Sequence, residues 1–177
     1  MNIKFKPLFL LLTSVLFSSL AIAKTDIHSG ALPDTIDIEK RKSWIYKLPK
    51  KRASLEFTIK LKQNDYFQII FSNNSKFSSE ILRLSISDAD CDAEHQLFAT
   101  YTLPKNKKAN LFKYMDHRVP WNQEQKITIN WIDGNRFTIT RNNESFSLDI
   151  FALPRFIKFY SYESEVTLNT SKITFAD

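Results

Sequence analysis

The sequence predicts an all-β fold, an antiparallel β-sandwich of about ten to twelve short strands in one domain. Apolar and polar residues alternate along most of the chain from Ala53 to Phe175, the pattern of strands that bury one face and leave the other in water. Short polar turns separate these runs at regular intervals. Apart from a candidate helical turn at residues 105–113, no segment has the apolar spacing of a helix.

The predicted strands follow one another to the end of the chain, and residues 43–48 form the first. The stretch "ASLEFTIKLKQNDYFQIIFS" at residues 53–72 predicts a hairpin, because apolar residues occupy alternate positions on both sides of a polar turn at residues 63–65. Residues 126–150 predict three antiparallel strands. Other predicted strands cover residues 80–87, 95–103, 155–162 and 165–175.

Two tight turns divide the three-stranded segment "KITINWIDGNRFTITRNNESFSLDI" at residues 126–150. Asp133-Gly134 is a strong hairpin signal, because a type I′ turn needs positive φ at both central positions. Asn142-Asn143 can serve the same purpose, since asparagine tolerates the left-handed conformation. The apolar residues of this segment, Trp131 among them, are predicted core.

The first 23 residues predict a cleaved secretory signal. Two lysines precede an apolar-rich run at residues 7–20, and "AIA" at Ala21 to Ala23 has the small-x-small pattern of a cleavage site. A membrane anchor is the alternative, but a run of about 14 residues is short for a spanning helix, which needs roughly 20. We therefore expect a secreted or periplasmic protein with a loose leader at 24–42 and one domain at 43–177.

The charge of the chain argues against one class of partner, and its cysteine content argues against an internal disulfide. Cleavage would remove 23 of the 177 residues, including two of 25 basic and none of 19 acidic residues, which leaves 154 residues with a net charge of +4. Basic residues scattered among acids do not favour nucleic acid as a partner. Cys91 is the only cysteine, so the predicted core forms without an internal disulfide.

The C-terminal half, "ITINWIDGNRFTITRNNESFSLDI" followed by "LPRFIKFYSYESEVTLNTSKITF", resembles the concanavalin A-like jelly roll, including its laminin-G-like and galectin-like members. The resemblance covers residues 53–177. It implies a sandwich whose closing strand, "SKITFAD", returns beside the N-terminal strand. It also implies carbohydrate binding on a sheet face.

The sequence departs from this family at its functional motifs. Galectin-like sites use a His-x-Asn-x-Arg strand, which this chain lacks. Glucanases of this fold carry Glu-x-Asp-x-Glu or Glu-x-Asp-x-x-Glu, and the nearest match, "TIDIE" at residues 35–39, has Thr35 at the first carboxylate position. We therefore expect a protein that is not an enzyme.

Trp121 and a polar sheet face are the candidate ligand-binding residues. Trp121 follows a proline in the polar loop "HRVPWNQEQ", where its ring could stack on a sugar. Polar residues alternate with apolar ones along several strands and could line a hydroxyl-binding face, the alternative being an ordinary wet face of a sheet. The candidates on this face are Arg83, Asn130, Arg136 and Asp149.

Acidic residues alternate in "SDADCDAEH", and Asp88, Asp90 and Asp92 could gather around Ca²⁺ if the backbone curls. Ala93 and Ala99 replace the glycine and glutamate that complete an EF-hand loop. A solvated acidic loop that protects a sheet edge is the alternative. No other cofactor is expected.

Two functional hypotheses follow. The first is an exported, non-enzymatic carbohydrate-binding domain whose partner lies at a cell surface. The second is a protein-interaction module of the cell envelope, or a secreted inhibitor or effector. A hydrolase with an unrecognised carboxylate pair is a third possibility, which two facing carboxylates in a cleft would support.

Overall fold

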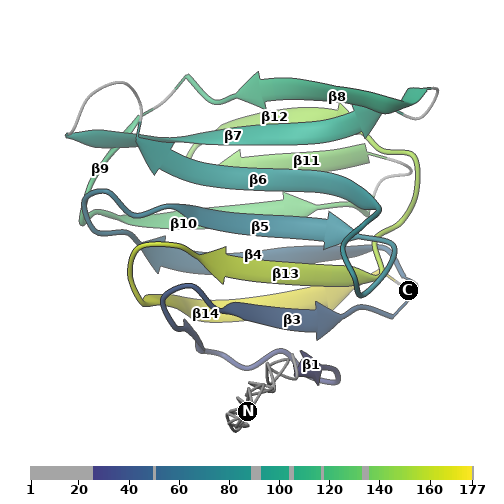
Figure 1. Ribbon diagram of the computed structural model, residues 1–177, viewed down its shortest axis with the longest axis horizontal. Coiled ribbons are helices and arrows are strands. Elements are labelled where there is room, and N and C mark those ends of the chain that lie inside the picture. Colours follow the sequence, from purple (N-terminus) through teal and green to yellow (C-terminus); the bar gives the residue numbers. More distant parts are fainter. Residues whose placement is uncertain are drawn as a thin grey trace, which may run out of the picture.

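The computed structural model describes residues 26–49, 51–88, 93–103, 106–116, 118–132 and 136–176. These residues form fourteen strands and no helix. The strands make two sheets that lie one behind the other, the eight-stranded sheet in front in Figure 1. The predicted β-sandwich is confirmed.

The eight-stranded sheet contains both early and late segments of the chain. Its order is β1-β3-β13-β5-β6-β7-β8, and β9 pairs with β7. β1 runs parallel to β3, and the other pairs are antiparallel. The strands are β1 (Ile27–His28), β3 (Ser43–Lys47), β5 (Phe67–Ser72), β6 (Glu80–Asp88), β7 (Glu94–Leu103), β8 (Asn106–Tyr114), β9 (Val119–Pro120) and β13 (Phe156–Ser161).

The six-stranded sheet has the order β12-β11-β10-β4-β14-β2. The last strand of the chain, β14, lies between β4 and β2, so the closing strand returns beside the N-terminal part as the family resemblance implied. A β-bulge interrupts the β14–β4 pairing between Asn169 and Lys172. The strands are β2 (Ile36–Ile38), β4 (Ala53–Lys60), β10 (Glu124–Asn130), β11 (Arg136–Arg141), β12 (Glu144–Asp149) and β14 (Val166–Phe175).

The structure differs from three of the sequence predictions. The predicted leader at 24–42 contains β1 and β2, and β2 pairs with β14, so the sandwich begins before Ser43. The candidate helical turn at 105–113 is strand β8 from residue 106. The strand count exceeds the predicted one because β1, β2 and β9 are only two or three residues long, too short to leave an alternating pattern.

Some sequence predictions concern residues that the structure does not describe. The proposed signal at residues 1–23, Cys91 and the turn Asp133-Gly134 lie outside the described residues. The other turn is confirmed, since Asn142 has a φ of 52°. No helix among the described residues is long and apolar enough to cross a membrane.

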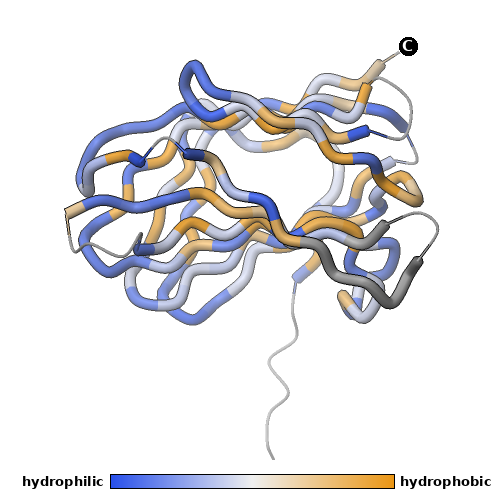
Figure 2. Tube along the Cα trace, turned by 90° about the horizontal axis from the view of Figure 1, so that it is seen from above, coloured by the Kyte–Doolittle hydropathy of each residue, from blue (hydrophilic) through white to orange (hydrophobic). Residues whose placement is uncertain are grey.

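The core lies between the two sheets and consists of aliphatic and aromatic side chains from nearly every long strand. Hydrophobic and hydrophilic residues alternate along the strands of both layers (Figure 2), so each strand gives one face to the core. Trp131 is fully buried, as predicted. The Phe159 ring joins the sheets, with its centroid 6.1 Å from that of Phe57 and 6.5 Å from that of Phe67.

Phe159→Ala should lower the free energy of unfolding by about 3–5 kcal/mol, because it removes a fully buried ring that contacts both sheets. Urea unfolding of the purified domain measures this. Thr128→Ala, on the outer face of β10, is the control and should cost less than about 1 kcal/mol. Equal losses in both variants would contradict the assignment of the core.

Candidate functional site

The face of the eight-stranded sheet that is turned away from the core carries an ordered array of polar and aromatic side chains. Antiparallel register aligns residues of neighbouring strands in rows across the sheet. Two rows run from β13 through β5, β6 and β7 to β8. The first row contains Tyr160, Gln68, Ser85, Phe98 and Tyr114, and the second contains Lys158, Ile70, Arg83, Thr100 and Phe112.

Three tyrosines gather at the β13 end of the first row. The Tyr162 ring centroid lies 4.4 Å from that of Tyr160 and 4.7 Å from that of Tyr66. Gln68, which pairs with Tyr160 and is buried, donates a hydrogen bond of 2.6 Å from Nε2 to the Tyr66 hydroxyl. This bond fixes the direction of the Tyr66 hydroxyl, which also lies 3.4 Å from Ser85 Oγ.

Two half-buried cations occupy the second row. Arg83 binds the Glu80 carboxylate in a two-pronged pair, with Nε 3.0 Å from Oε2 and Nη2 2.6 Å from Oε1. Lys158 Nζ lies 4.6 Å from the centre of the Phe77 ring, a cation–π contact. We refer to these residues together as the outer-face cluster: Tyr66, Gln68, Glu80, Arg83, Lys158, Tyr160 and Tyr162.

Burial changes the proton affinities in this cluster. Loss of water lowers the pKa of Lys158, and Arg83 lowers it further while Glu80 acts in the opposite direction. Loss of water raises the pKa of Tyr162, and the neighbouring tyrosines add to this rise. The hydrogen bond to Glu80 raises the pKa of Arg83. At neutral pH the cluster therefore holds a charged guanidinium, a protonated phenol and an amine that releases its proton more easily than a free lysine.

The cluster can bind anions and hydroxyl groups and can exchange protons. Phenol, amide and guanidinium groups donate or accept hydrogen bonds to sugar hydroxyls and carboxylates. Within the described residues no group of three or more histidine, cysteine, aspartate or glutamate side chains could hold a metal ion. The side chains on this face can transfer protons and neutralise the charge of a bound anion.

The structure divides the predicted ligand-binding residues between two opposite faces. Arg83 belongs to the outer-face cluster, whereas Asn130, Arg136 and Asp149 lie on the outer face of the six-stranded sheet. Arg136 and Asp149 form an exposed ion pair of 3.1 Å. Asn130 accepts a hydrogen bond from the backbone of Ile132 and so serves a local turn. The prediction that all four residues share one polar face is wrong, because the core separates the two sheets and their outer faces point in opposite directions.

Trp121 is not an open platform. Its side chain is half-buried and packs against the core, and its ring centroid lies 4.7 Å from that of His95. Its indole nitrogen is buried and has no hydrogen-bond partner among the described residues. The expectation of an exposed stacking surface at this residue is therefore wrong.

Beneath Trp121, a polar trio bridges the two sheets. Arg141 of β11 donates a hydrogen bond of 2.5 Å from Nε to the Gln125 side-chain oxygen of β10, and Nη2 donates one of 2.7 Å to His95 Nδ1 of β7. All three side chains are buried, and the Arg141 and His95 residues have no exposed surface. Desolvation lowers the pKa of Arg141 to about 10. Desolvation and the positive charge of Arg141 lower the pKa of His95 to about 3.

The predicted calcium loop is only partly described. Asp88 ends β6 as an exposed residue, and Asp90 and Asp92 lie outside the described residues. The calcium site stays a prediction.

Sequence reasoning missed most of the outer-face cluster. Tyr66 and Gln68 lie in "YFQIIFS", and Lys158, Tyr160 and Tyr162 lie in "KFYSY". In both stretches polar or phenolic residues alternate with apolar ones, and this alternation indicates that the polar and phenolic residues lie on the outer face of their strand. The sequence could not show that the two strands are neighbours, because 83 residues or more separate β5 from β13 along the chain.

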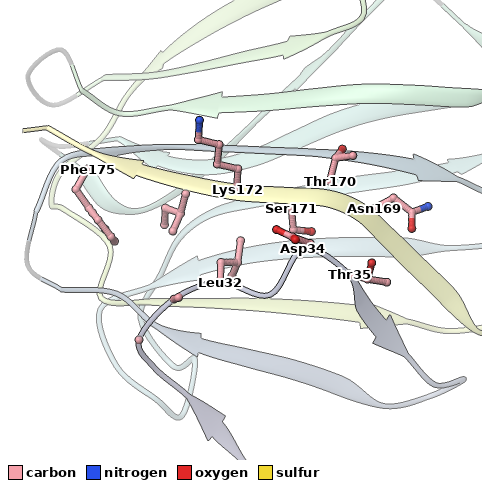
Figure 3. Close-up of a pocket in the computed structure, with 11 residues that line it drawn as sticks. Leu32, Asp34, Thr35, Asn169, Thr170, Ser171, Lys172 and Phe175 are labelled. Carbon is pink, nitrogen blue, oxygen red and sulfur yellow. The ribbon is translucent and has the colours of Figure 1, made fainter.

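A pocket of about 640 Å³ lies beside β14, on the other sheet (Figure 3). Asp34 and Ser171 face each other there, and the Ser171 backbone nitrogen donates a hydrogen bond of 2.9 Å to the Asp34 carbonyl oxygen. The pocket also contains Lys172 and apolar residues such as Phe175. The pocket holds one exposed carboxylate and one lysine, a weaker case for chemistry than the outer-face cluster, where burial shifts the pKa values of Lys158 and Tyr162.

Comparison with known proteins identifies the fold. No protein-family profile and no curated protein sequence matches this chain. Solved structures that match include an alginate lyase from Alteromonas sp. 272, with a TM-score of 0.60 and 12% identity over 80% of this chain and 87% of the lyase. The galectin LEC-6 from Caenorhabditis elegans matches with a TM-score of 0.54 and 9% identity over 80% of this chain and 96% of the galectin. A double mutant of congerin II has a TM-score of 0.52 and 14% identity, over 80% of this chain and 100% of the mutant.

The chain has a concanavalin A-like jelly-roll fold. Alginate lyases and galectins both have this fold, so the resemblance inferred from the sequence is confirmed. The expectation that the protein is not an enzyme is contradicted, because the matching structures include several alginate lyases, which are enzymes. That expectation rested on a missing glucanase carboxylate motif, and a lyase does not need that motif.

The buried trio predicts how stability depends on pH. His95 has a pKa of about 3 in the folded protein and about 6.5 when unfolded, so the unfolded state binds an extra proton between these values. Stability should therefore fall as the pH is lowered from about 6.5 towards 3, by at most about 1.4 kcal/mol per pH unit from this residue.

Urea unfolding at a series of pH values measures this slope. His95→Gln, which keeps a polar side chain beside Arg141, should give a shallower slope than the wild type below pH 6.5. Equal slopes in the two proteins would mean that His95 is not held neutral by its surroundings.

Proposed function

We propose that the outer face of the eight-stranded sheet binds an acidic polysaccharide and cleaves it by β-elimination. The observation that carries this proposal is the outer-face cluster, which gathers two cations, three phenols and an amide on one sheet face, with the phenols and the amide in contact. The likeness to alginate lyases and galectins supports a carbohydrate as the ligand. The lyases act on a polysaccharide, and galectins are lectins with the same fold.

Charge complementarity supports an acidic sugar rather than a neutral one. Arg83 places a charged guanidinium on this face, and the chain without residues 1–23 has a net charge of +4. The Glu80 pair uses Nε and Nη2 of Arg83, which leaves Nη1 to bind a uronate carboxylate. A bound carboxylate gains charge-assisted hydrogen bonds from the guanidinium, and this withdraws electron density from the adjacent C5–H bond.

Elimination needs a base for the C5 proton and an acid for the leaving oxygen. Lys158, whose pKa is lowered, takes the proton from C5 in its neutral form. The C4–O bond then breaks, a C4–C5 double bond forms, and Tyr162, whose raised pKa keeps it protonated, donates its proton to the departing oxygen. Proton exchange with water returns both side chains to their starting states.

The N-terminal segment supports the proposal that the domain acts outside the cytoplasm. A signal at residues 1–23 would export the domain to the periplasm or the outside of the cell, where acidic polysaccharides are accessible. N-terminal sequencing of the protein from culture fractions tests this part, with Lys24 as the expected first residue.

Incubation with alginate should produce an unsaturated uronate, measured by the ultraviolet absorbance of the new double bond. Lys158→Met and Tyr162→Phe should each lower kcat/KM at least about 100-fold, because each removes one proton-transfer group. The rate should rise with pH as Lys158 becomes neutral and fall again where Tyr162 loses its proton.

Arg136→Ala is the control, since Arg136 carries an exposed charge on the opposite sheet face. This variant should keep the wild-type rate. Binding of alginate without unsaturated product would refute the elimination step, and failure of the wild type to bind alginate or another acidic polysaccharide would refute the proposed function as a whole.

A further inference from the structure

Two large side chains on β8 are unusually exposed. Phe112 and Tyr114 have 63% and 54% of their surface in contact with solvent. Their rings lie side by side, with centroids 6.2 Å apart, and the Phe98 ring of β7 lies 5.7 Å from that of Phe112. A contiguous group of exposed aromatic rings on a soluble domain marks a binding surface more often than a single exposed residue does.

These rings belong to the same face as the outer-face cluster. Tyr114 pairs with Phe98 in the row that begins at Tyr160. Phe112 pairs with Thr100 in the row that contains Lys158 and Arg83. No core or second sheet lies between the two groups, so one ligand can contact both.

We propose that Phe98, Phe112 and Tyr114 form an aromatic platform that stacks on pyranose rings of the same polysaccharide. This inference rests on the proposed function and deepens it, because it sets the direction and the length of the substrate. The polysaccharide crosses the strands, with its reacting unit at β13, β5 and β6 and a distant part of the chain on β7 and β8.

The strand spacing sets the length that the site recognises. Four intervals separate β13 from β8, and at about 4.8 Å each they span roughly 19 Å. A disaccharide at the outer-face cluster is too short to reach the platform. A long oligosaccharide contacts both regions and gains the stacking energy of the aromatic rings.

A sugar fits the platform better than a second copy of the protein does. The rings stand on the sheet face, in line with hydroxyl-binding and cationic groups, rather than along the hydrogen-bonding edge of β8. Lys113, between the two exposed rings in sequence, is itself exposed, and a lysine on an edge strand opposes edge-to-edge pairing.

The test compares the wild type with a double variant, Phe112→Ala with Tyr114→Ala, by isothermal titration calorimetry, with Lys158→Met added to both proteins so that neither cleaves the probes. The probes are an alginate disaccharide and an alginate oligosaccharide that exceeds the span of roughly 19 Å. The double variant should lose about tenfold in affinity for the long probe, because two stacking contacts are removed, and should bind the disaccharide as the wild type does. Ile27→Ala removes an exposed apolar side chain at β1 and is the matched control, with no change expected for either probe.

Three outcomes would overturn the inference. The first is an unchanged affinity of the double variant for the long probe. The second is an equal loss for both probes, which would indicate damage to the sheet. The third is a wild type that dimerises in sedimentation experiments while the double variant is monomeric with unchanged affinity. Failure of the wild type to bind either probe would instead refute the proposed function, so the two failures are distinguishable.

Discussion

Burial of one face of each sheet against the other is the constraint on which the rest of the structure depends. The inner faces are almost entirely apolar, and Phe159, Phe57 and Phe67 join them at the centre. The sequence has one cysteine, so no disulfide within the chain can assist this packing. Because each strand gives its inward-facing residues to the core, a binding or catalytic site must use the outward-facing residues or the ends of the sandwich.

The outward-facing polar side chains are arranged differently on the two sheets. On the six-stranded sheet, polar side chains pair with each other near the solvent, as in the Arg136–Asp149 ion pair and the hydrogen bond of 2.9 Å between Thr138 and Ser147. Such exposed pairs contribute little to the stability of the fold, and they leave few polar groups available to bind a ligand. On the eight-stranded sheet, burial shifts the pKa values of Lys158 and Tyr162, and titratable groups with shifted pKa values are typical of functional sites.

Local sequence pattern predicted the strands, but not their neighbours. The alternation around Trp131 correctly placed that side chain in the core, and Asn142 correctly marked a turn. Arg83 was identified as a site residue but was grouped with Arg136, because alternation says which residues share a face of one strand and not which strands share a sheet. Trp121 was misassigned for a related reason. Its polar neighbours in sequence suggested exposure, whereas His95, from a different strand, packs against its ring.

The central claim is that the outer face of the eight-stranded sheet is the polysaccharide site. Hydrogen–deuterium exchange of the whole protein, with and without an alginate oligosaccharide, tests it directly without altering any residue. We predict increased protection in β5, β6 and β13, and unchanged exchange in β11 and β12 on the other sheet. Protection confined to the six-stranded sheet, or to the pocket beside β14, would contradict it.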